Sequence, residues 1–311
     1  VGRVIPIIDF RHYDESHAAS IASLAEQVAS ALTSEGFMGI QNLGIDQSDI
    51  ERTFKLAEWF FSQELSMKKL SSYASAGENF GFQEVGIEHL DPTAPADIKE
   101  TFTMRNLLNH DPADRRWPND LFRETMIAFY QICLESAYRV QRVCAKALSL
   151  EPDYFVQKHQ GENVSLRLLY YPADTSYSVA PSQLGAGAHT DYGMLTLLFQ
   201  NGVGGLEILD SDGRWQAAEP EADTILINTG DLMERWTNGR FRSTPHRVKS
   251  KVGHNARFSI AMFVDPDSAT PIQVLDSCLD HRKSEASPLI TAGEYIQKRI
   301  EASHRRGVPA S

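Results

Sequence analysis

The stretch V-S-L-R-L-L-Y-Y, residues 164–171, begins a change in the character of the sequence. It combines β-branched, aliphatic and aromatic residues, the composition favoured in β-strands. Four similar runs follow: M-L-T-L-L-F-Q (194–200), L-E-I-L-D (206–210), T-I-L-I-N (224–228) and F-S-I-A-M-F-V (258–264). Glycine, aspartate and asparagine pairs separate them, as in N-G-V-G-G at 201–205. Many short strands divided by turn signals predict a β-sandwich or barrel, and we expect a double-sheet jelly roll.

Helical patterns flank this β-rich part on both sides. Apolar residues recur at spacings of three and four within 17–34, and Gly36 follows as a helix stop signal. Similar patterns predict helices over 47–62, 119–149 and 289–303, and a strand over 36–42. We therefore predict an α+β, mainly β fold, in which N-terminal and C-terminal helices flank a double-stranded β-helix (jelly roll, cupin-like) core.

Three regions follow from this pattern. Residues 1–160 form an N-terminal helical and strand region, 161–270 form the jelly-roll core, and 271–311 form a C-terminal helical extension. The flanking helices lack enough apolar partners of their own. We expect them to pack on the sheet, so that the chain makes one compact unit.

Composition excludes several classes of protein. The 311 residues are 42% hydrophobic and 23% charged, with a net charge of −11. The sequence has no basic stripe of the kind found in nucleic-acid-binding proteins, so we expect no nucleic-acid partner. No apolar run is long enough for a membrane span, and the N-terminal V-G-R-V-I-P-I-I-D-F predicts a strand rather than a signal peptide. The three cysteines show no paired spacing. We expect a cytoplasmic protein whose partner is a small molecule.

The tripeptide H-T-D at 189–191 contains two potential metal ligands. Residues two apart in extended chain point to the same side, so the imidazole of His189 and the carboxylate of Asp191 can converge on one ion. This spacing alone is weak, because such tripeptides are also common in solvated turns. His246 offers a third ligand, since the strand-turn-strand pattern before it can return the chain to His189. Two histidines and one carboxylate form the facial triad typical of Fe(II).

A cation follows in the next predicted strand. Arg257 and Ser259 alternate with apolar residues, so both point to one side. A buried guanidinium requires an anion, and arginine suits a carboxylate through two parallel hydrogen bonds. That anion could be a protein carboxylate, or a carboxylated small molecule bound beside the metal.

These residues resemble the H-x-D…H…R-x-S pattern of the Fe(II)/2-oxoglutarate-dependent dioxygenases. The chain is most similar to the isopenicillin N synthase-like branch of that family. The resemblance extends over nearly the whole chain and includes V-I-P-I-I-D-F, G-F-M-G-I-Q-N-L-G-I, W-T-N-G-R-F-R-S-T-P-H-R-V and L-I-T-A-G-E-Y.

The resemblance implies a role for each site residue. His189, Asp191 and His246 would hold Fe(II), leaving positions for 2-oxoglutarate and O2. Arg257 and Ser259 would bind the distal carboxylate of 2-oxoglutarate. The family's tyrosine before proline, which reaches the same carboxylate, corresponds to Tyr171, although a core tyrosine is an equal reading of the residue alone.

One residue departs from the family pattern. Many plant members carry asparagine two residues before that tyrosine, where this chain has Leu169. Arg167, on the same face of the predicted strand, could supply the missing donor to the carboxylate near the iron. Candidate substrate contacts are Phe80, Phe82, Thr101 and Phe102 in the expected helical half, and Leu206 and Phe263 in the core, although each residue taken alone is more typical of simple core.

The resemblance predicts hydroxylation or desaturation of a C–H bond in a small organic metabolite, with succinate and CO2 as coproducts, and a role in secondary metabolism. The alternatives are an isopenicillin N synthase-like oxidase that uses Fe(II) and O2 without 2-oxoglutarate, an ethylene-forming variant, or a non-enzymatic jelly roll with a structural metal. A structural site is normally closed by four protein ligands, and the sequence offers only three.

Overall fold

The computed structural model describes residues 5–91, 93–111, 113–173, 183–250, 255–279 and 289–304. Its helices are α1 (Ala18–Ser34), α2 (Gln47–Phe61), α3 (Leu65–Lys68), α4 (Asp120–Ala147), α5 (Asp231–Trp236) and α6 (Ala292–His304), with short 3-10 turns η1 (Lys69–Ser71), η2 (Val156–Lys158) and η3 (Asp276–Cys278). Its strands are β1 (Ile7–Asp9), β2 (Phe37–Gln41), β3 (Phe80–Gln83), β4 (Glu100–Arg105), β5 (Val164–Tyr171), β6 (Ala186–His189), β7 (Leu195–Gln200), β8 (Leu206–Leu209), β9 (Trp215–Ala217), β10 (Ile225–Thr229), β11 (His246–Val248), β12 (Arg257–Val264), β13 (Pro271–Ile272) and β14 (Ile290–Thr291).

Two sheets of unequal size build the predicted jelly-roll core. The larger has eight strands in the order β1-β2-β10-β7-β12-β5-β4-β3, and the smaller has four in the order β6-β11-β8-β9. Nearly all neighbours are antiparallel, with β1 and β2 the parallel exception. A small apolar cluster between the sheets includes Phe37, Tyr171, Leu206 and Val248.

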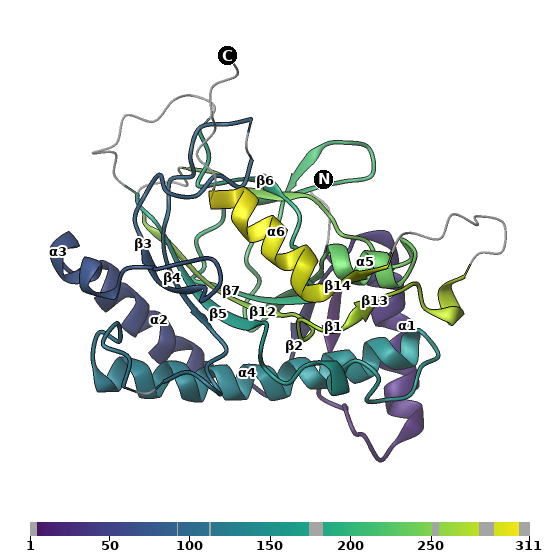
Figure 1. The fold of residues 1–311 in the computed structure, drawn as a ribbon. Helices are drawn as coiled ribbons and strands as arrows, with labels where there is room; N and C mark the ends of the chain where they lie inside the picture. The colour runs from purple at the N-terminus through teal and green to yellow at the C-terminus, as the bar shows by residue number, and fades with distance from the viewer. Residues whose placement is uncertain are drawn as a thin grey trace.

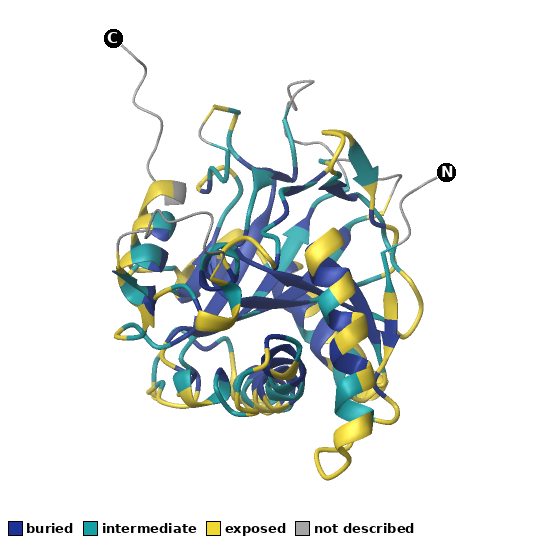
Figure 2. Cartoon of the chain, turned by 90° about the vertical axis from the view of Figure 1, so that its right-hand side faces the viewer, coloured by how far each residue is buried: buried dark blue, intermediate teal, exposed yellow. Residues whose placement is uncertain are grey.

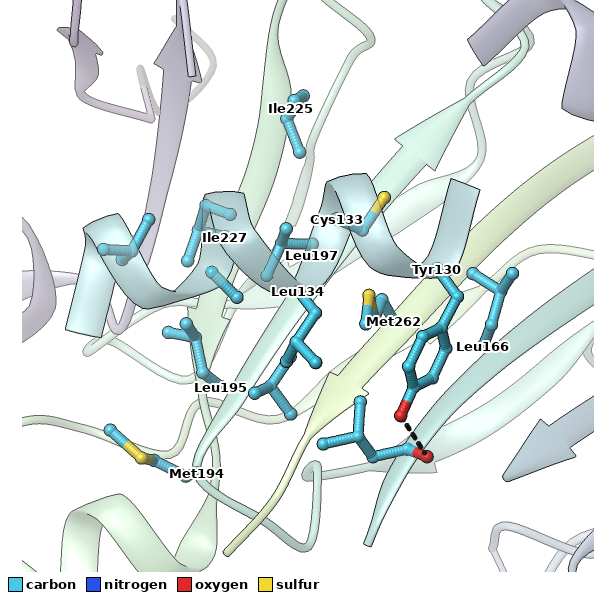
Figure 3. Close-up of a cluster of buried hydrophobic side chains, with 14 of the residues drawn as sticks. Tyr130, Cys133, Leu134, Leu166, Met194, Leu195, Leu197, Ile225, Ile227 and Met262 are labelled. Carbon is cyan, nitrogen blue, oxygen red and sulfur yellow. Dashed lines mark hydrogen bonds between the residues drawn. The ribbon is translucent and has the colours of Figure 1, made fainter. Parts of the chain in front are cut away.

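The outer face of the large sheet carries the main core. Helix α4 lies along this face, and α1 and α2 pack beside it (Figure 1). Figure 3 shows how Tyr130, Cys133 and Leu134 of α4 meet strand residues such as Leu166 and Met262. Buried residues gather between these helices and the sheet, and exposed residues lie on the outward helix faces (Figure 2). The burial of Cys133 and Cys144 agrees with the plain interpretation of helical cysteines as free thiols.

Strand alternation separates the core from the site. In β12, Ile260 and Met262 join the helix-facing core, while Arg257, Ser259 and Phe263 face the space between the sheets. Strands β5, β7 and β10 follow the same rule, because successive side chains point to opposite faces of a sheet. In each central strand, alternate residues therefore face the helix-covered core, and the residues between them face the space between the sheets.

The expectation of a mostly helical first half was incomplete. Residues 80–83 and 100–105 form strands β3 and β4, and β4 pairs with β5. Likewise β2 pairs with β10, so the large sheet joins the regions 1–160 and 161–270. This pairing supports our proposal that these regions form one unit. No helix within the described residues is long and apolar enough to cross a membrane.

The predicted helix ends agree with the backbone. Helix α1 stops at Ser34, and Gly36 adopts a φ of 68°, a left-handed conformation that suits glycine. A side chain there would also meet the carbonyl oxygen of Arg242, 2.5 Å from the position of an added Cβ. The turn therefore requires glycine for both conformation and space.

His159 gives the first testable prediction. It is buried, its Nδ1 lies 2.7 Å from the carbonyl oxygen of Phe155, and burial lowers its pKa to about 4. The pKa of a histidine in an unfolded chain is ~6.5. Between about pH 6.5 and 4 the unfolded state therefore binds a proton at His159 that the folded state does not bind. The free energy of unfolding should fall in this window by ~3 kcal/mol through His159 alone.

Urea unfolding of wild type and His159→Gln at pH 7 and pH 4.5 measures this contribution. The variant should lose less stability on acidification than wild type. His12→Gln, at an exposed position, is the matched control and should behave as wild type. An equal loss in His159→Gln and wild type would contradict the assignment.

Candidate active site

Antiparallel pairing of β6 and β11 brings the three potential ligands together. His246 lies opposite His189 in the register, and Asp191 follows β6 by two residues. The Nε2 atoms of His246 and His189 lie 3.6 Å and 3.9 Å from Asp191 Oδ1. One ligand atom from each of the three residues falls within 4.8 Å of the others. Among the described residues this is the only such group of histidine, cysteine and carboxylate side chains.

Backbone carbonyls orient both imidazoles. Nδ1 of His189 lies 2.7 Å from the carbonyl oxygen of Gly187, and Nδ1 of His246 lies 3.1 Å from that of Thr244. A carbonyl can only accept, so each Nδ1 carries the proton and donates it. Each Nε2 then presents its lone pair toward the centre, which is the tautomer that binds a metal.

Two donors fix the carboxylate. Thr196 Oγ1 and Asn228 Nδ2 donate to Asp191 Oδ2 at 2.6 Å and 2.7 Å. Thr196 and Asn228 lie opposite each other on β7 and β10. Because Oδ2 is occupied by these donors, Oδ1 remains directed at the histidines. The rotamer of the ligand is therefore set before any ion binds.

The charge states suit a divalent cation. Burial, and then the proximity of His246, lowers the pKa of His189 to about 3, so this ring is neutral at pH 7. Burial opposes the charged form of Asp191, but the two histidines and its hydrogen bonds hold the pKa of the carboxyl below its ordinary value. Two neutral nitrogens and one carboxylate oxygen fit Fe(II), with one side open for exogenous ligands.

Arg257 is a buried cation that lacks a protein anion. It is 3% exposed, its two terminal nitrogens donate to Ser259 Oγ and to Gln200 Oε1 at 3.2 Å each, and its Nε has no partner. No carboxylate forms an ion pair with it in the part of the chain that the structure describes. Its guanidinium lies 4.8 Å from the ring centroid of Tyr171. The two hydrogen-bond acceptors of Arg257, Ser259 and Gln200, carry no charge, so this position is built to receive an anion.

One cavity connects Arg257 with the ligand cluster. Its volume is about 140 Å³, and Ser259, Tyr171, Leu206 and Phe263 line it together with all three ligands. The sequence therefore identified both ends of one cavity.

Four candidate substrate contacts lie elsewhere. Phe82 and Phe102 contact Phe60 in the helix-facing core, and Phe80 contacts Phe102. None of the three candidates lines the cavity. Strand alternation is the reason, since Thr103 on β4 faces the cavity while Phe102 faces the helices. Thr101 does not line the cavity either, but its hydroxyl accepts a hydrogen bond from Arg167 at 3.2 Å. The three phenylalanines therefore belong to the core packed against the helices, and the cavity gives no support to a direct contact between them and a substrate.

Arg167 belongs to a buried charged network at the cavity wall. Its Nη2 donates to Glu88 Oε1 at 2.8 Å, and Glu88 Oε2 lies 2.9 Å from Lys99 Nζ. Lys99 also donates to Asp97 at 2.6 Å. Two cations and two carboxylates balance here, so the network carries no net charge. The Nε of Arg167 and the hydroxyl of Thr103 have no hydrogen-bond partner.

The sequence pattern alone did not predict four polar residues of the site: Thr196, Asn228, Glu88 and Lys99. A signal existed for the first two, because each is a polar residue within an otherwise apolar strand run, M-L-T-L-L-F and T-I-L-I-N. A buried polar side chain requires a partner. Glu88 and Lys99 lie in stretches without periodic pattern, and only the fold brings them to the site.

Two family profiles match most of the chain. That of the 2OG-Fe(II) oxygenase superfamily matches residues 162–266, and that of the non-haem dioxygenase in morphine synthesis N-terminal region matches residues 5–124. The chain belongs to the Fe(II)/2-oxoglutarate oxygenase family. The predicted resemblance is therefore confirmed, as are the enzyme class, the jelly-roll fold and the use of Fe(II) and 2-oxoglutarate.

Relatives of this oxygenase cover nearly its whole length. It is 30% identical to the 2-oxoglutarate-Fe(II) type oxidoreductase ppzD of Metarhizium rileyi, over 96% of this chain and 91% of the relative. It is 31% identical to the proline hydroxylase buaE of Petromyces alliaceus, over 89% and 92%. A full-length Neurospora crassa protein, solved in complex with alpha-KG and thymine, matches with a TM-score of 0.87, 30% identity and 97% of both chains covered.

Proposed function

We propose that this oxygenase hydroxylates a C–H bond of a small, uncharged, polar ring compound. The observation that carries the proposal is the cavity itself, which has an unpaired arginine at one end, three metal ligands at the other, and a charge-balanced wall between them. Each part suits one reactant: an anionic cosubstrate, an iron ion and a neutral substrate.

The roles of the residues follow from these contacts. His189, Asp191 and His246 would hold the iron, with the two histidine Nε2 atoms and Asp191 Oδ1 as the ligand atoms. Arg257 and Ser259 bind the distal carboxylate of 2-oxoglutarate, and Tyr171 closes that end beneath the guanidinium. Iron bound here supplies the O2 chemistry that oxidises 2-oxoglutarate to succinate and CO2 and the substrate to an alcohol.

Arg167 fits a substrate contact better than a contact to 2-oxoglutarate. Glu88 already neutralises it, so a second carboxylate would compete with Glu88 for the same guanidinium. Its free Nε–H and the free hydroxyl of Thr103 lie on neighbouring strands, paired in the register. Such donors suit the carbonyl oxygens of an uncharged molecule.

The substrate class combines these donors with the apolar lining. Tyr192, Phe263 and Leu206 offer flat and aliphatic surface to a ring. One relative carries thymine in its structure and another is named a proline hydroxylase. A cyclic amide such as a pyrimidine fits the neutral wall. A free amino acid carries an ammonium and a carboxylate, and the charge-balanced wall offers neither of them an unpaired counter-charge. A cytoplasmic location and a role in secondary metabolism stay predictions.

Succinate release with Fe(II), 2-oxoglutarate and O2, measured with thymine, uracil and free proline, tests the proposal. Turnover with a pyrimidine above the substrate-free rate supports it, and turnover with proline alone contradicts the neutral-substrate class. A visible charge-transfer band on adding 2-oxoglutarate to the Fe(II) protein separates this function from an oxidase that uses no cosubstrate. Absence of both the band and succinate overturns the assignment of Arg257.

Thr103→Val tests the substrate wall. The two side chains have nearly the same shape, and the hydroxyl has no partner in the free protein, so the melting temperature should not fall. The substrate KM should rise about tenfold through loss of one hydrogen bond, while the KM for 2-oxoglutarate stays constant. Thr33→Val, on the exposed face of α1, is the control. An unchanged substrate KM excludes Thr103 as a contact.

A further inference from the structure

The C-terminal helix α6 forms part of the cavity wall. Ile296 and Ile300 are one turn apart, both are buried, and both line the cavity that contains the metal ligands. Figure 1 shows α6 on the side of the large sheet opposite α4. Burial of these two isoleucines would be sufficient to hold such a helix in place. Arg299, the neighbour of Ile300, makes additional polar contacts that burial of the helix does not explain.

Arg299 contacts the residues on both sides of the carboxylate ligand. Its Nη2 donates to Thr190 Oγ1 at 3.3 Å, and its guanidinium lies 4.5 Å from the ring centroid of Tyr192. Thr190 separates His189 from Asp191, and Tyr192 directly follows Asp191. The side chain of Arg299 therefore contacts the side chains of the two residues that precede and follow Asp191 in the sequence.

Asp231 completes the connection. Its Oδ2 accepts hydrogen bonds from Arg299 Nη1 and from the hydroxyl of Tyr295, at 2.6 Å each. Its backbone N–H donates to the carbonyl oxygen of Asp191 at 2.9 Å. The start of α5 thus joins the ligand to two residues of α6. Ser243 Oγ donates to the other carboxylate oxygen at 2.7 Å and fixes the orientation of Asp231.

Stability alone does not account for this arrangement. The Arg299 side chain is 34% exposed, and partly exposed ion pairs contribute little to folding. The segment 190–192 lies outside any strand, because β6 ends at His189. Thr196 and Asn228 fix the carboxylate of Asp191, but neither contacts Thr190 or Tyr192 in the hydrogen bonds described. The hydrogen bond from Asp231 N–H to the Asp191 carbonyl, and the contacts of Arg299 with Thr190 and Tyr192, connect this segment to α5 and α6.

We propose that Arg299 is a positioning residue of the iron centre, which holds the segment 190–192 so that Asp191 faces the two histidines and Tyr192 closes the cavity. The C-terminal helix is in this way part of the active site. The inference rests on the proposed function for its substrate readout, but its metal readout is independent of any activity.

Titration of the apoprotein with Co(II), followed by visible absorption, tests the metal part. Arg299→Gln should raise the Co(II) dissociation constant about tenfold, in the range found when groups that orient metal ligands are removed. Arg299→Lys retains a charge for Asp231 but lacks the planar fork that reaches Thr190 and stacks on Tyr192, so it should also bind Co(II) more weakly. Lys298→Gln changes the charge equally at an exposed neighbouring position and should match wild type.

The kinetic part separates positioning from helix docking. Arg299→Gln should raise the substrate KM, through Tyr192, and increase the succinate formed per substrate hydroxylated. A lower melting temperature with an unchanged Co(II) dissociation constant overturns the proposal, because Arg299 then only docks the helix. If Arg299→Gln does not fold, Thr190→Val carries the test, and an unchanged Co(II) dissociation constant in that variant overturns it equally. If the proposed function is wrong, wild type will show no turnover with the substrates tested. The comparison of Co(II) dissociation constants between wild type and Arg299→Gln will still be valid.

Discussion

Asp191→Asn should abolish turnover while leaving the protein folded. The amide retains the shape of the carboxylate and can still accept the hydrogen bonds of Thr196 and Asn228 through its oxygen. Its NH2 group then faces the histidines, where it has no lone pair to offer a metal. Succinate formation should fall at least ~1,000-fold, because iron contributes several kcal/mol to the reaction.

Metal content and succinate release measure this effect. The variant should bind little Fe(II) or Co(II) at concentrations that saturate wild type. Asp212→Asn, at an exposed position, makes the same change of charge and is the matched control. Succinate formation near the wild-type rate in Asp191→Asn protein would falsify the assignment of Asp191 as a ligand.

Arg257→Met should raise the KM for 2-oxoglutarate roughly 100-fold with a smaller change in kcat, because the variant lacks two charge-assisted hydrogen bonds to the distal carboxylate. The variant should also remove a buried charge that has no anionic partner in the described protein, so the apoprotein should not lose stability. Burial lowers the pKa of this guanidinium, as expected for a cation without a counter-ion.

A thermal shift assay gives a second readout of Arg257. At 2-oxoglutarate concentrations about 100 times the dissociation constant, the metal-loaded wild type should gain ~2.7 kcal/mol of stability. Arg257→Met should lose this gain, whereas Arg214→Met at an exposed position should retain it. A retained gain and an unchanged KM would show that the anion bound by Arg257 is not 2-oxoglutarate, as in an oxidase whose substrate carries the carboxylate.

Local pattern was sufficient to predict strand β12 and its two faces, but it missed β4 at the same cavity. The alternation of Arg257 and Ser259 with Phe258 and Ile260 agrees with the two faces of β12, because the strand period of two does not depend on the rest of the fold. The same rule applied to E-T-F-T-M-R would have separated Thr103 from Phe102. The error there was to place this segment in a helical half, so its faces were not considered.

The substrate wall could not be predicted from the sequence. Glu88 lies in a loop and Lys99 lies next to a strand. The pairing of Glu88 with both Lys99 and Arg167 depends on the packing of β4 against β5. A buried charge is tolerated only with a partner, but the sequence does not say which partner. The contacts of Arg299 with Thr190 and Asp231 are equally non-local, because these residues lie 109 and 68 positions before Arg299 in the chain.

The sequence by itself determined the chemistry of the ligands and the alternation of side chains between the two faces of a recognised strand such as β12. H-T-D sets two donors at a fixed spacing, and the period of a strand is a property of the backbone. Only the tertiary structure decided that Oδ1 rather than Oδ2 of Asp191 faces the histidines, that the charges in the wall beside the metal ligands balance, and that the last helix contacts the segment 190–192. These features arise from contacts between elements far apart in the chain, whose geometry no local pattern contains.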